Sequence, residues 1–357
     1  RSASRSSLRG GLRCSPSSSI FPSVGRRGIP RIVLAVRPIH ASCPDPTQVG
    51  RSLVGRPGSF VLASGDPASP YGRYSYVGCD PDGETSELDP LEGRAALRRA
   101  HEPFAFVPRF VGVLPYESMR ARLERTAWVA PETRSAPLAV QVSWARYPAV
   151  LVLDHARGEA FAVGETDGAA RDLERLVRAE PGPDAPVALT VEDPEPGGAH
   201  VARVARAIEL IRAGDLYQVN LARRLALRLE GGGGGAPDHA SALACLRRMT
   251  AAAPSSFGAL IVLRSGLAVV STSPELALDA AARDDGLGFS ALVTEPIKGT
   301  RPRGASPERD AALARELELD EKERAELSMI IDGERNDLAR VSVRGSVEVA
   351  GAPRVVT

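Results

Sequence analysis

A stretch rich in proline, glycine and acidic residues divides the chain into two segments with different patterns. It reads EPGPDAPVALTVEDPEPGG and covers residues 180–198, a composition typical of linkers. Before it, short β-prone runs are separated by turn residues, whereas helical periodicity and strands alternate after it. The sequence therefore predicts a β-rich N-terminal domain over residues 45–180, a linker over 181–199 and a second domain over 200–357.

Local patterns predict individual elements on both sides of this linker. Before it, strands are expected at residues 59–64, 72–77, 104–113, 138–144 and 149–153, and helices at 90–100 and 169–178. After it, the pattern predicts a helix over 200–213 that ends at Gly214 and Asp215, a strand over 216–227, and a hairpin over 257–273. Two further helices are expected to start after Ser306 and after Asp320, which have N-cap side chains.

The first 44 residues differ in composition from the rest of the chain. They contain eight arginines, many serines and no aspartate or glutamate. This composition resembles an organellar transit segment, although a disordered extension or an over-extended reading frame explains it equally simply. We expect residues 1–44 to be a disordered or mis-assigned extension that takes no part in the fold.

The overall composition excludes several classes of function. The net charge is +1, with 43% hydrophobic and 4% aromatic residues, which argues against a nucleic-acid binder or a membrane-surface protein. No run of 18 apolar residues predicts a membrane span. The four cysteines are scattered and form no CxxC pair, which is typical of free thiols in a reducing compartment such as the cytoplasm.

Lysine is almost absent from this chain. Of 45 basic side chains, only Lys298 and Lys322 are lysines. Arginine stays protonated in proteins, whereas a lysine can become neutral and attack carbon. Lys298 lies in the run PIKGTRPRG (296–304), between proline and glycine, and is therefore a candidate for amine chemistry. The alternative is an ordinary surface charge.

Two carboxylates in the last third of the chain are further candidates. Glu275 follows a proline at the end of an apolar strand, and strand ends commonly carry site residues. Glu326 lies on the helix that follows Asp320. The alternatives are a solvated loop carboxylate for Glu275 and an exposed i,i+4 ion pair with Lys322 for Glu326.

Five blocks together resemble the chorismate-utilising enzyme family. They are IRAGDLYQVNLARRL (211–225), STSPELAL (271–278), PIKGTRPRG (296–304), DEKERAELSMIIDGERNDLARV (320–341) and GSVEV (345–349). Several long blocks in the order of the family are far more specific than a single motif. The resemblance implies an α+β fold of packed antiparallel sheets flanked by helices.

One block indicates the branch of the family. Anthranilate-forming members resemble the 296–304 block but have alanine at the position of Lys298, whereas lysine is typical of the aminodeoxychorismate synthase component I branch. Asn220 also resembles that branch. The implied reaction converts chorismate and ammonia to 4-amino-4-deoxychorismate, a step towards 4-aminobenzoate and folate.

The resemblance also implies roles for individual residues. Lys298 corresponds to a nucleophile that attacks C2 of the chorismate ring, and Glu275 to the general acid that protonates the departing C4 hydroxyl. The backbone amides of Gly299 and Thr300 would hold the ring carboxylate. Glu326 corresponds to a ligand of Mg²⁺, the implied cofactor. Ammonia would come from a separate glutamine amidotransferase subunit.

Two alternatives to C4 amination stay open at this point. One is an enzyme that adds ammonia or water at C2 of chorismate, giving anthranilate or isochorismate. The other is a non-catalytic remnant that binds a partner or a metabolite. Because the family pattern continues beyond the block GSVEV, we expect a C-terminally truncated chain that has exposed sheet edges and is inactive by itself.

Overall fold

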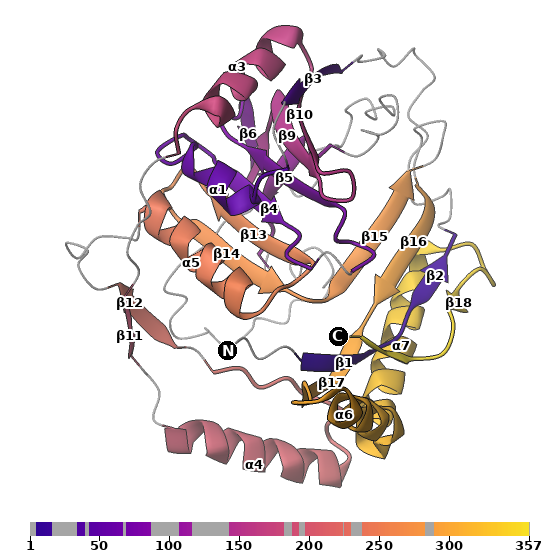
Figure 1. Ribbon diagram of the computed structural model, residues 1–357. Helices are drawn as coiled ribbons and strands as arrows, with labels where there is room; N and C mark the ends of the chain where they lie inside the picture. Colours follow the sequence, from indigo (N-terminus) through magenta and orange to yellow (C-terminus); the bar gives the residue numbers. More distant parts are fainter. Residues whose placement is uncertain are drawn as a thin grey trace.

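The structure is a computed structural model of the chain (Figure 1). It describes residues 5–15, 34–39, 43–66, 69–86, 107–115, 143–181, 188–192, 197–223, 225–229, 238–282 and 289–356. The predicted helix over 90–100 lies outside these residues. Antiparallel sheets and packed helices make up the described part, which confirms the expected α+β class.

A seven-stranded antiparallel sheet forms the larger layer. Its strands, in spatial order, are β14 (Ala268–Ser273), β13 (Phe257–Val262), β4 (Phe60–Ala63), β5 (Tyr74–Gly78), β9 (Ala149–Asp154), β10 (Glu159–Gly164) and β3 (Ala35–Ile39). One face is covered by the helices α1 (Pro46–Arg51), α3 (Asp167–Arg178) and α5 (His239–Ala252). Against the other face packs a small sheet of β6 (Gly83–Thr85), β8 (Ser143–Arg146) and β7 (Phe110–Val113).

Strand β9 shows why the large sheet is covered on both faces. All six residues of its sequence AVLVLD are buried. Because successive side chains of a strand point to opposite faces, Leu151 and Leu153 join the cluster beneath the helices, while Val150 packs with Phe60 and Tyr147 on the other face. A continuous apolar run is the pattern expected of a strand buried on both sides.

The large sheet contains strands from both sides of the predicted linker. Strand β4 precedes the linker and β13 follows it, and the two pair in antiparallel register from Gly258 opposite Ala63 to Ile261 opposite Phe60. The hairpin of β13 and β14 confirms the prediction for residues 257–273, with Gly266 at a φ of 84° in its turn. The two predicted domains therefore share one sheet.

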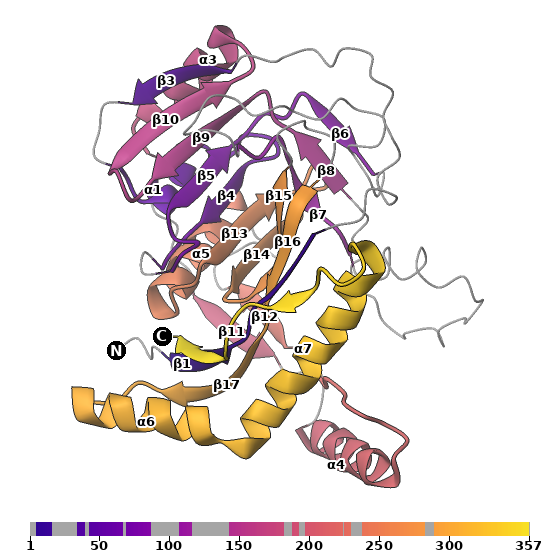
Figure 2. The same ribbon diagram turned by 90° about the vertical axis from the view of Figure 1, so that its right-hand side faces the viewer.

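Two smaller sheets and two helices carry the sequence blocks of residues 271–349 (Figure 2). One sheet has the order β15 (Leu276–Ala282), β16 (Phe289–Glu295), β2 (Leu12–Cys14) and β18 (Glu348–Val349), and the other the order β17 (Ile297–Pro302), β1 (Arg5–Arg9) and β19 (Arg354–Val356). The helices α6 (Pro307–Leu319) and α7 (Glu321–Val341) pack against them. The side chains of Ser306 and Asp320 cap these helices as predicted, each accepting a hydrogen bond from a first-turn amide.

The N-terminal strands correct the expectation for residues 1–44. Strand β1 lies between β17 and β19, and β2 lies between β16 and β18. Leu8 and Leu12 are buried at 2% and 0% exposure. The expectation of a disordered extension is wrong for residues 5–15, because pairing with strands almost 300 residues away leaves no mark on local composition. Strand β3 is likewise part of the large sheet.

Residues 188–229 form a separate group of elements. Within the predicted linker, β11 (Leu189–Glu192) pairs with β12 (Ala226–Leu229) in a two-stranded sheet. The predicted helix is confirmed as α4 (Gly197–Ala213), and Gly214 has the positive φ of 82° expected of its C-terminal glycine. The strand predicted over 216–227 is wrong for most of its length, because only its last two residues belong to β12.

Gly333 in the middle of α7 offers a simple stability test. A Cβ added there would meet no atom within 4 Å, and glycine in a helix interior costs about 1 kcal/mol relative to alanine. Gly333→Ala is therefore expected to raise the free energy of unfolding by about 1 kcal/mol, measured by urea denaturation. Gly299→Ala is the control with the opposite sign, because its φ is 68° and its Cβ would lie 2.7 Å from Leu317 Cδ1.

Candidate active site

The site is built around a bulge in β17. Opposite β17, Ser7 of β1 pairs with Thr300 and Leu8 pairs with Lys298, so Gly299 has no counterpart across the strand pair. Gly299 has a φ of 68°, and glycine at positive φ is the usual bulge residue. An added Cβ would lie 3.0 Å from Glu323 Oε2. Only glycine lets β17 bend here while the first turn of α7 lies directly against it.

Glu275 is held next to Lys298 by the backbone. It lies in the short connection between β14 and β15, and its Oε1 accepts a hydrogen bond of 2.9 Å from the amide N–H of Ile297. The neighbouring residue along β17 is Lys298. The structure therefore places the Glu275 carboxylate on the backbone amide next to Lys298, at the start of the bulged strand, although the two residues are more than 20 positions apart in the sequence.

Of the two lysines in the chain, Lys298 is the half-buried one. Its side chain has neither a hydrogen bond nor an ion pair with any residue that the structure describes. Lys322 differs, because its side chain is 72% exposed and its Nζ lies 3.1 Å from Glu326 Oε1. The hydrogen bond to Glu326 and the charges of Glu323 and Glu326 raise the pKa of Lys322. The two lysines therefore differ in surroundings, because Lys298 has no carboxylate partner among the described residues.

Glu326 forms the ion pair that sequence analysis raised as its alternative. The Lys322 ammonium lies 3.1 Å from Glu326 Oε1 and 3.6 Å from Glu323 Oε1, so one cation is shared by two carboxylates. No group of three or more acidic, histidine or cysteine side chains is arranged for metal binding within the described ranges. Mg²⁺ usually takes only one or two protein carboxylates together with water, so the donor set of Glu323 and Glu326 fits such an ion.

Sequence analysis missed Glu323. The residue lies one turn before Glu326 on α7 and faces the bulge at Gly299. Arg301, the residue after Thr300, donates hydrogen bonds to Glu316 at 2.8 Å and to Asp320 at 2.6 Å. These contacts fasten β17 to the junction of α6 and α7 and so position Glu323. The i,i+3 spacing of Glu323 and Glu326 is the sequence signal that places both carboxylates on one side of the helix.

Arg9 of β1 also holds residues next to the site in place. The composition of the first 44 residues did not predict this role. Its guanidinium pairs with Glu295 at 3.0 Å, where the side chains are only 8% and 13% exposed, and it donates to the carbonyl oxygen of Pro274 at 3.4 Å. These two residues end β16 and precede Glu275. On the other side of Glu295, burial and the Glu295 carboxylate raise the pKa of Tyr71 to about 12.

Glu334 of α7 is a second carboxyl group near Glu275. Its Oε2 is buried without a hydrogen-bond partner among the described residues. Burial raises the pKa of Glu334, and the carboxylates of Glu275 and Asp337 add to the effect, while Thr294 opposes it. Folding therefore raises the pKa of Glu334 above its ordinary value.

This arrangement predicts a pH-dependent stability difference for Glu334→Gln. A carboxyl group whose pKa is raised by folding contributes full stability below its unfolded pKa, near 4.5, and loses it as the pH rises through the folded pKa. Relative to the wild type, the variant is expected to become more stable as the pH rises above the ordinary value of 4.5. Urea denaturation at several pH values measures this, with Glu318→Gln on the exposed face of α6 as the control. A pH-independent difference would contradict the assignment.

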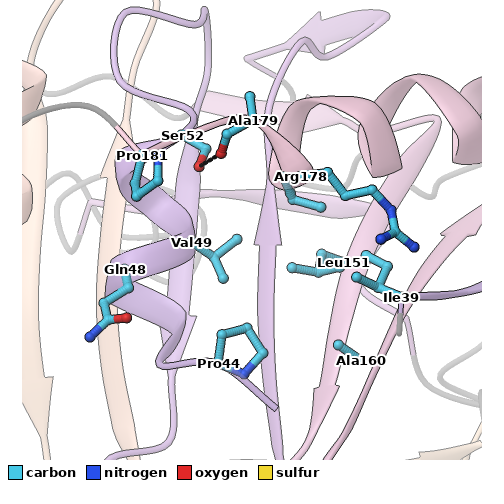
Figure 3. Close-up of a pocket in the computed structure, with 11 residues that line it drawn as sticks. Ile39, Pro44, Gln48, Val49, Ser52, Leu151, Ala160, Arg178, Ala179 and Pro181 are labelled. Carbon is cyan, nitrogen blue, oxygen red and sulfur yellow. Dashed lines mark hydrogen bonds between the residues drawn. The ribbon is translucent and has the colours of Figure 1, made fainter. Parts of the chain in front are cut away.

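A cavity elsewhere is separate from these residues. It has a volume of about 230 Å³ and lies between α1, α3 and the large sheet (Figure 3). Its lining is mostly apolar, and Ser52 closes one side by donating a hydrogen bond to the carbonyl oxygen of Ala179 at 3.4 Å. Arg178 is the charged residue in the lining, and it is paired with Glu174 at 3.0 Å. None of Glu275, Lys298 and Glu326 lines this cavity.

The chain belongs to the family of chorismate binding enzymes, whose profile matches residues 52–357. Among curated relatives, anthranilate synthase component 1 of Streptomyces coelicolor is 33% identical over 325 residues, which cover 83% of this chain and 60% of the relative. The aminodeoxychorismate synthase of Streptomyces griseus is 34% identical over 258 residues, covering 69% of this chain and 33% of the relative. The chain thus spans less than two thirds of the length of either protein.

Solved structures confirm the fold. The menaquinone-specific isochorismate synthase of Escherichia coli superposes with a TM-score of 0.55 at 15% identity, covering 91% of this chain and 65% of that protein. Anthranilate synthase component I of Streptococcus pneumoniae gives 0.54 at 20% identity, covering 79% of this chain and 68% of that protein. Across the described residues, no helix is both long and apolar enough to cross a membrane.

Proposed function

We propose that this chain is the chorismate-aminating component of an aminodeoxychorismate synthase, which replaces the C4 hydroxyl of chorismate with ammonia. The observation that supports this most directly is the half-buried, unpaired amine of Lys298 beside the amide that holds Glu275. The family match supports chorismate as the substrate. The name of the S. griseus relative supports C4 as the position of amination.

The proposed reaction passes through a covalent intermediate. The neutral amine of Lys298 attacks C2 of the ring, both ring double bonds shift by one position, and the C4 hydroxyl leaves as water with a proton from Glu275. Ammonia then attacks C4, both double bonds shift back, and Lys298 is expelled as the free amine. Each half-reaction displaces one group, and the sum replaces hydroxyl by amino at C4.

The surrounding residues would bind and orient the substrate. Oε1 of Glu275 is occupied by the Ile297 amide, which leaves Oε2 to carry the proton. Glu323 and Glu326 would hold Mg²⁺, which offsets the negative charge of the substrate carboxylates. The backbone of Gly299 and Thr300 would contact the ring carboxylate. This stretch of backbone follows Lys298 and lies against Glu323.

The proposal includes a partner protein. Relatives named component 1 are one part of a two-part enzyme, and we expect a separate glutamine amidotransferase to supply the ammonia. With free ammonium salts the chain would need no such partner for the chemical step. The ammonia-dependent reaction is therefore the one that tests this chain.

A second candidate is amination at C2, which gives anthranilate. It is favoured by the names of several curated relatives, among them the proteins of S. coelicolor and Aeropyrum pernix. Lys298 argues against it, because a lysine that occupies C2 covalently prevents ammonia from being added there.

Identification of the product decides between the two candidates. Chorismate, Mg²⁺ and ¹⁵N-ammonium are incubated with the protein that carries this chain. A C4-amino product is expected. Anthranilate, isochorismate or no product would contradict the proposal.

Glu275→Gln provides a test of the general acid. Glutamine retains an oxygen that accepts the hydrogen bond of the Ile297 amide but has no proton to donate to the leaving hydroxyl. We expect kcat to fall by about 10²–10⁴-fold, the usual contribution of a general acid. Steady-state kinetics of the ammonia-dependent reaction measure this, with Glu318→Gln as the control for loss of one exposed negative charge. A change in KM alone would contradict the role.

A further inference from the structure

One cluster of reactive side chains plays no part in the proposed reaction. Cys43 Sγ lies 3.6 Å from His155 Nδ1, and His155 Nε2 lies 2.7 Å from Ser75 Oγ. The first distance is a hydrogen-bonding separation for a thiol, because sulfur is larger than oxygen. A nucleophile beside a base, with the base oriented by a third group, is the arrangement of an activated nucleophile. We call these three residues the Cys43 cluster.

The pairing of β5 with β9 places His155 beside Ser75. The two strands are antiparallel neighbours in the large sheet, with Ser75 opposite Leu153 (Figure 1). His155 follows the last residue of β9, and its backbone N–H donates a hydrogen bond of 2.8 Å to the carbonyl oxygen of Arg73. Ser75 is 0% exposed, so the group that orients the imidazole belongs to the interior of the sheet.

The turn after β9 fixes both His155 and Cys43. Asp154 accepts a hydrogen bond of 3.2 Å from the backbone N–H of Ala156. At the other end of the turn, the carbonyl oxygen of Gly158 accepts the Cys43 N–H at 3.0 Å. The thiol and the imidazole are therefore held by backbone contacts to one turn.

Access to solvent distinguishes Cys43 from two of the other cysteines. Cys14 and Cys79 are buried, whereas Cys43 is half-buried. Cys79 also donates a hydrogen bond of 3.1 Å to Asp80 Oδ2, and burial and this carboxylate raise its pKa to about 12. Buried structural cysteines are inert, so Cys43 and Cys245 are the thiols that a small reagent can reach.

The protonation states of the pair suit transfer of a proton from sulfur to nitrogen. Burial lowers the pKa of His155 below its ordinary value of 6.5, against the opposing charges of Asp154 and Asp45, so most of the imidazole is neutral at neutral pH. Burial and the charge of Asp154 raise the pKa of the Cys43 thiol above its ordinary value of 9.0. The sulfur therefore keeps its proton and needs an adjacent base in order to attack.

The hydrogen bond to Ser75 suits the tautomer in which His155 is a base towards Cys43. Ser75 Oγ accepts a hydrogen bond of 2.9 Å from the backbone N–H of Ser64. A hydroxyl oxygen can accept two hydrogen bonds, and the second comes from His155 when its proton is on Nε2. The lone pair of Nδ1 then faces the Cys43 thiol.

A disulfide is the electrophile that suits this cluster. Attack on a carbonyl carbon requires hydrogen-bond donors aimed at the developing oxyanion. Attack on a disulfide sulfur requires a nucleophile, a transfer of its proton and a leaving thiol. Cys43 and His155 supply the first two requirements, and the reagent supplies the third.

We propose that Cys43 is a site of reversible modification by low-molecular-mass disulfides, with His155 as its base. The thiol proton moves to His155 Nδ1 as the sulfur of Cys43 attacks one sulfur of the reagent. The sulfur–sulfur bond of the reagent breaks, a new one forms to Cys43, and the departing thiolate takes the proton from His155. Cys43 is thereby oxidised, and half of the reagent is reduced to a thiol. The inference does not depend on the reaction proposed for chorismate.

The probe for this site is glutathione disulfide, added at neutral pH to the protein that carries this chain. Cys43 is expected to gain a glutathionyl group at least about tenfold faster than Cys245, and dithiothreitol should remove it. Cys245 is the matched control, because it is also half-buried, burial raises the pKa of its thiol, and it forms no hydrogen bond with any residue that the structure describes. Peptide mapping by mass spectrometry measures both rates.

His155→Gln tests the base. The glutamine amide can still contact Ser75 Oγ but cannot accept a proton from the thiol. We expect the rate at Cys43 to fall at least about tenfold and the rate at Cys245 to stay the same. Cys79 reports on the fold, because this buried thiol reacts only if the variant unfolds. The comparison of Cys43 with Cys245 in the wild type tests the proposal even if this variant does not fold.

Three results would overturn the proposal. The first is a wild-type protein in which Cys43 reacts no faster than Cys245. The second is a folded His155→Gln variant in which the rate at Cys43 is unchanged. The third is a Cys43 that iodoacetamide alkylates rapidly but glutathione disulfide leaves unmodified, because an activated thiol would then serve another class of electrophile.

Discussion

Lys298→Ala is expected to abolish the covalent adduct that forms when chorismate and Mg²⁺ are added without ammonia. In the proposed mechanism the amine of Lys298 has then displaced the C4 hydroxyl and has no second nucleophile to release it. The wild-type protein should gain the mass of chorismate less one water. Turnover with ammonia should fall on the order of 10⁴-fold or more in the variant, as for other covalent nucleophiles. Intact-protein mass spectrometry and product formation measure the two effects.

The composition of the chain makes the assignment of the adduct direct. Lys298 and Lys322 are its only two lysines, so peptide mapping has few amines to distinguish. Lys298→Arg keeps the positive charge but cannot act as a nucleophile, and it should lose the adduct as completely as Lys298→Ala. Lys322→Arg should retain the adduct at Lys298. An adduct that survives in Lys298→Ala, or turnover unaffected by the change, would reject covalent catalysis.

Local sequence signals predicted the elements that depend on neighbouring residues. The N-caps Ser306 and Asp320, the glycine that ends α4 and the hairpin turn at Gly266 all have the predicted form. Each depends on contacts within a few residues along the chain. The strand expected over 216–227 failed for the opposite reason. Its alternation suits a strand, but a strand forms only beside a partner.

The candidate site, like the fold, was predictable only where local sequence signals exist. Lys298 was selected from composition and Glu275 from its place at a strand end, and in the structure Glu275 accepts a hydrogen bond from the amide of Ile297, the residue before Lys298. Glu323 was missed because its importance depends on the bulge at Gly299, where no Cβ intervenes. Arg9 was missed because its partner Glu295 lies 286 residues further along the chain. Contacts of this kind arise from tertiary packing rather than from local pattern.

Leu12→Ala tests the most unexpected feature of the fold, the insertion of the N-terminal strands. Leu12 is 0% exposed and packs in a cluster with Leu292 of β16 and Leu338 of α7. Truncating a fully buried leucine removes its burial energy and leaves a cavity, which costs about 2–5 kcal/mol. The free energy of unfolding of the chain, measured by urea denaturation, is expected to fall by that amount.

The control for Leu12→Ala is Leu319→Ala at the end of α6. Leu319 is 72% exposed, and an exposed substitution of this kind changes stability by no more than about 0.5 kcal/mol. If residues 5–15 were a disordered extension, Leu12→Ala would behave like this control, because an unpacked leucine has no burial to lose. A large loss at Leu12 also bears on the site, since β1 and β2 continue one another and Arg9 lies between Leu8 and Leu12. Loosening this segment should release Glu295 and the turn that carries Glu275, so Leu12→Ala should also weaken formation of the adduct at Lys298.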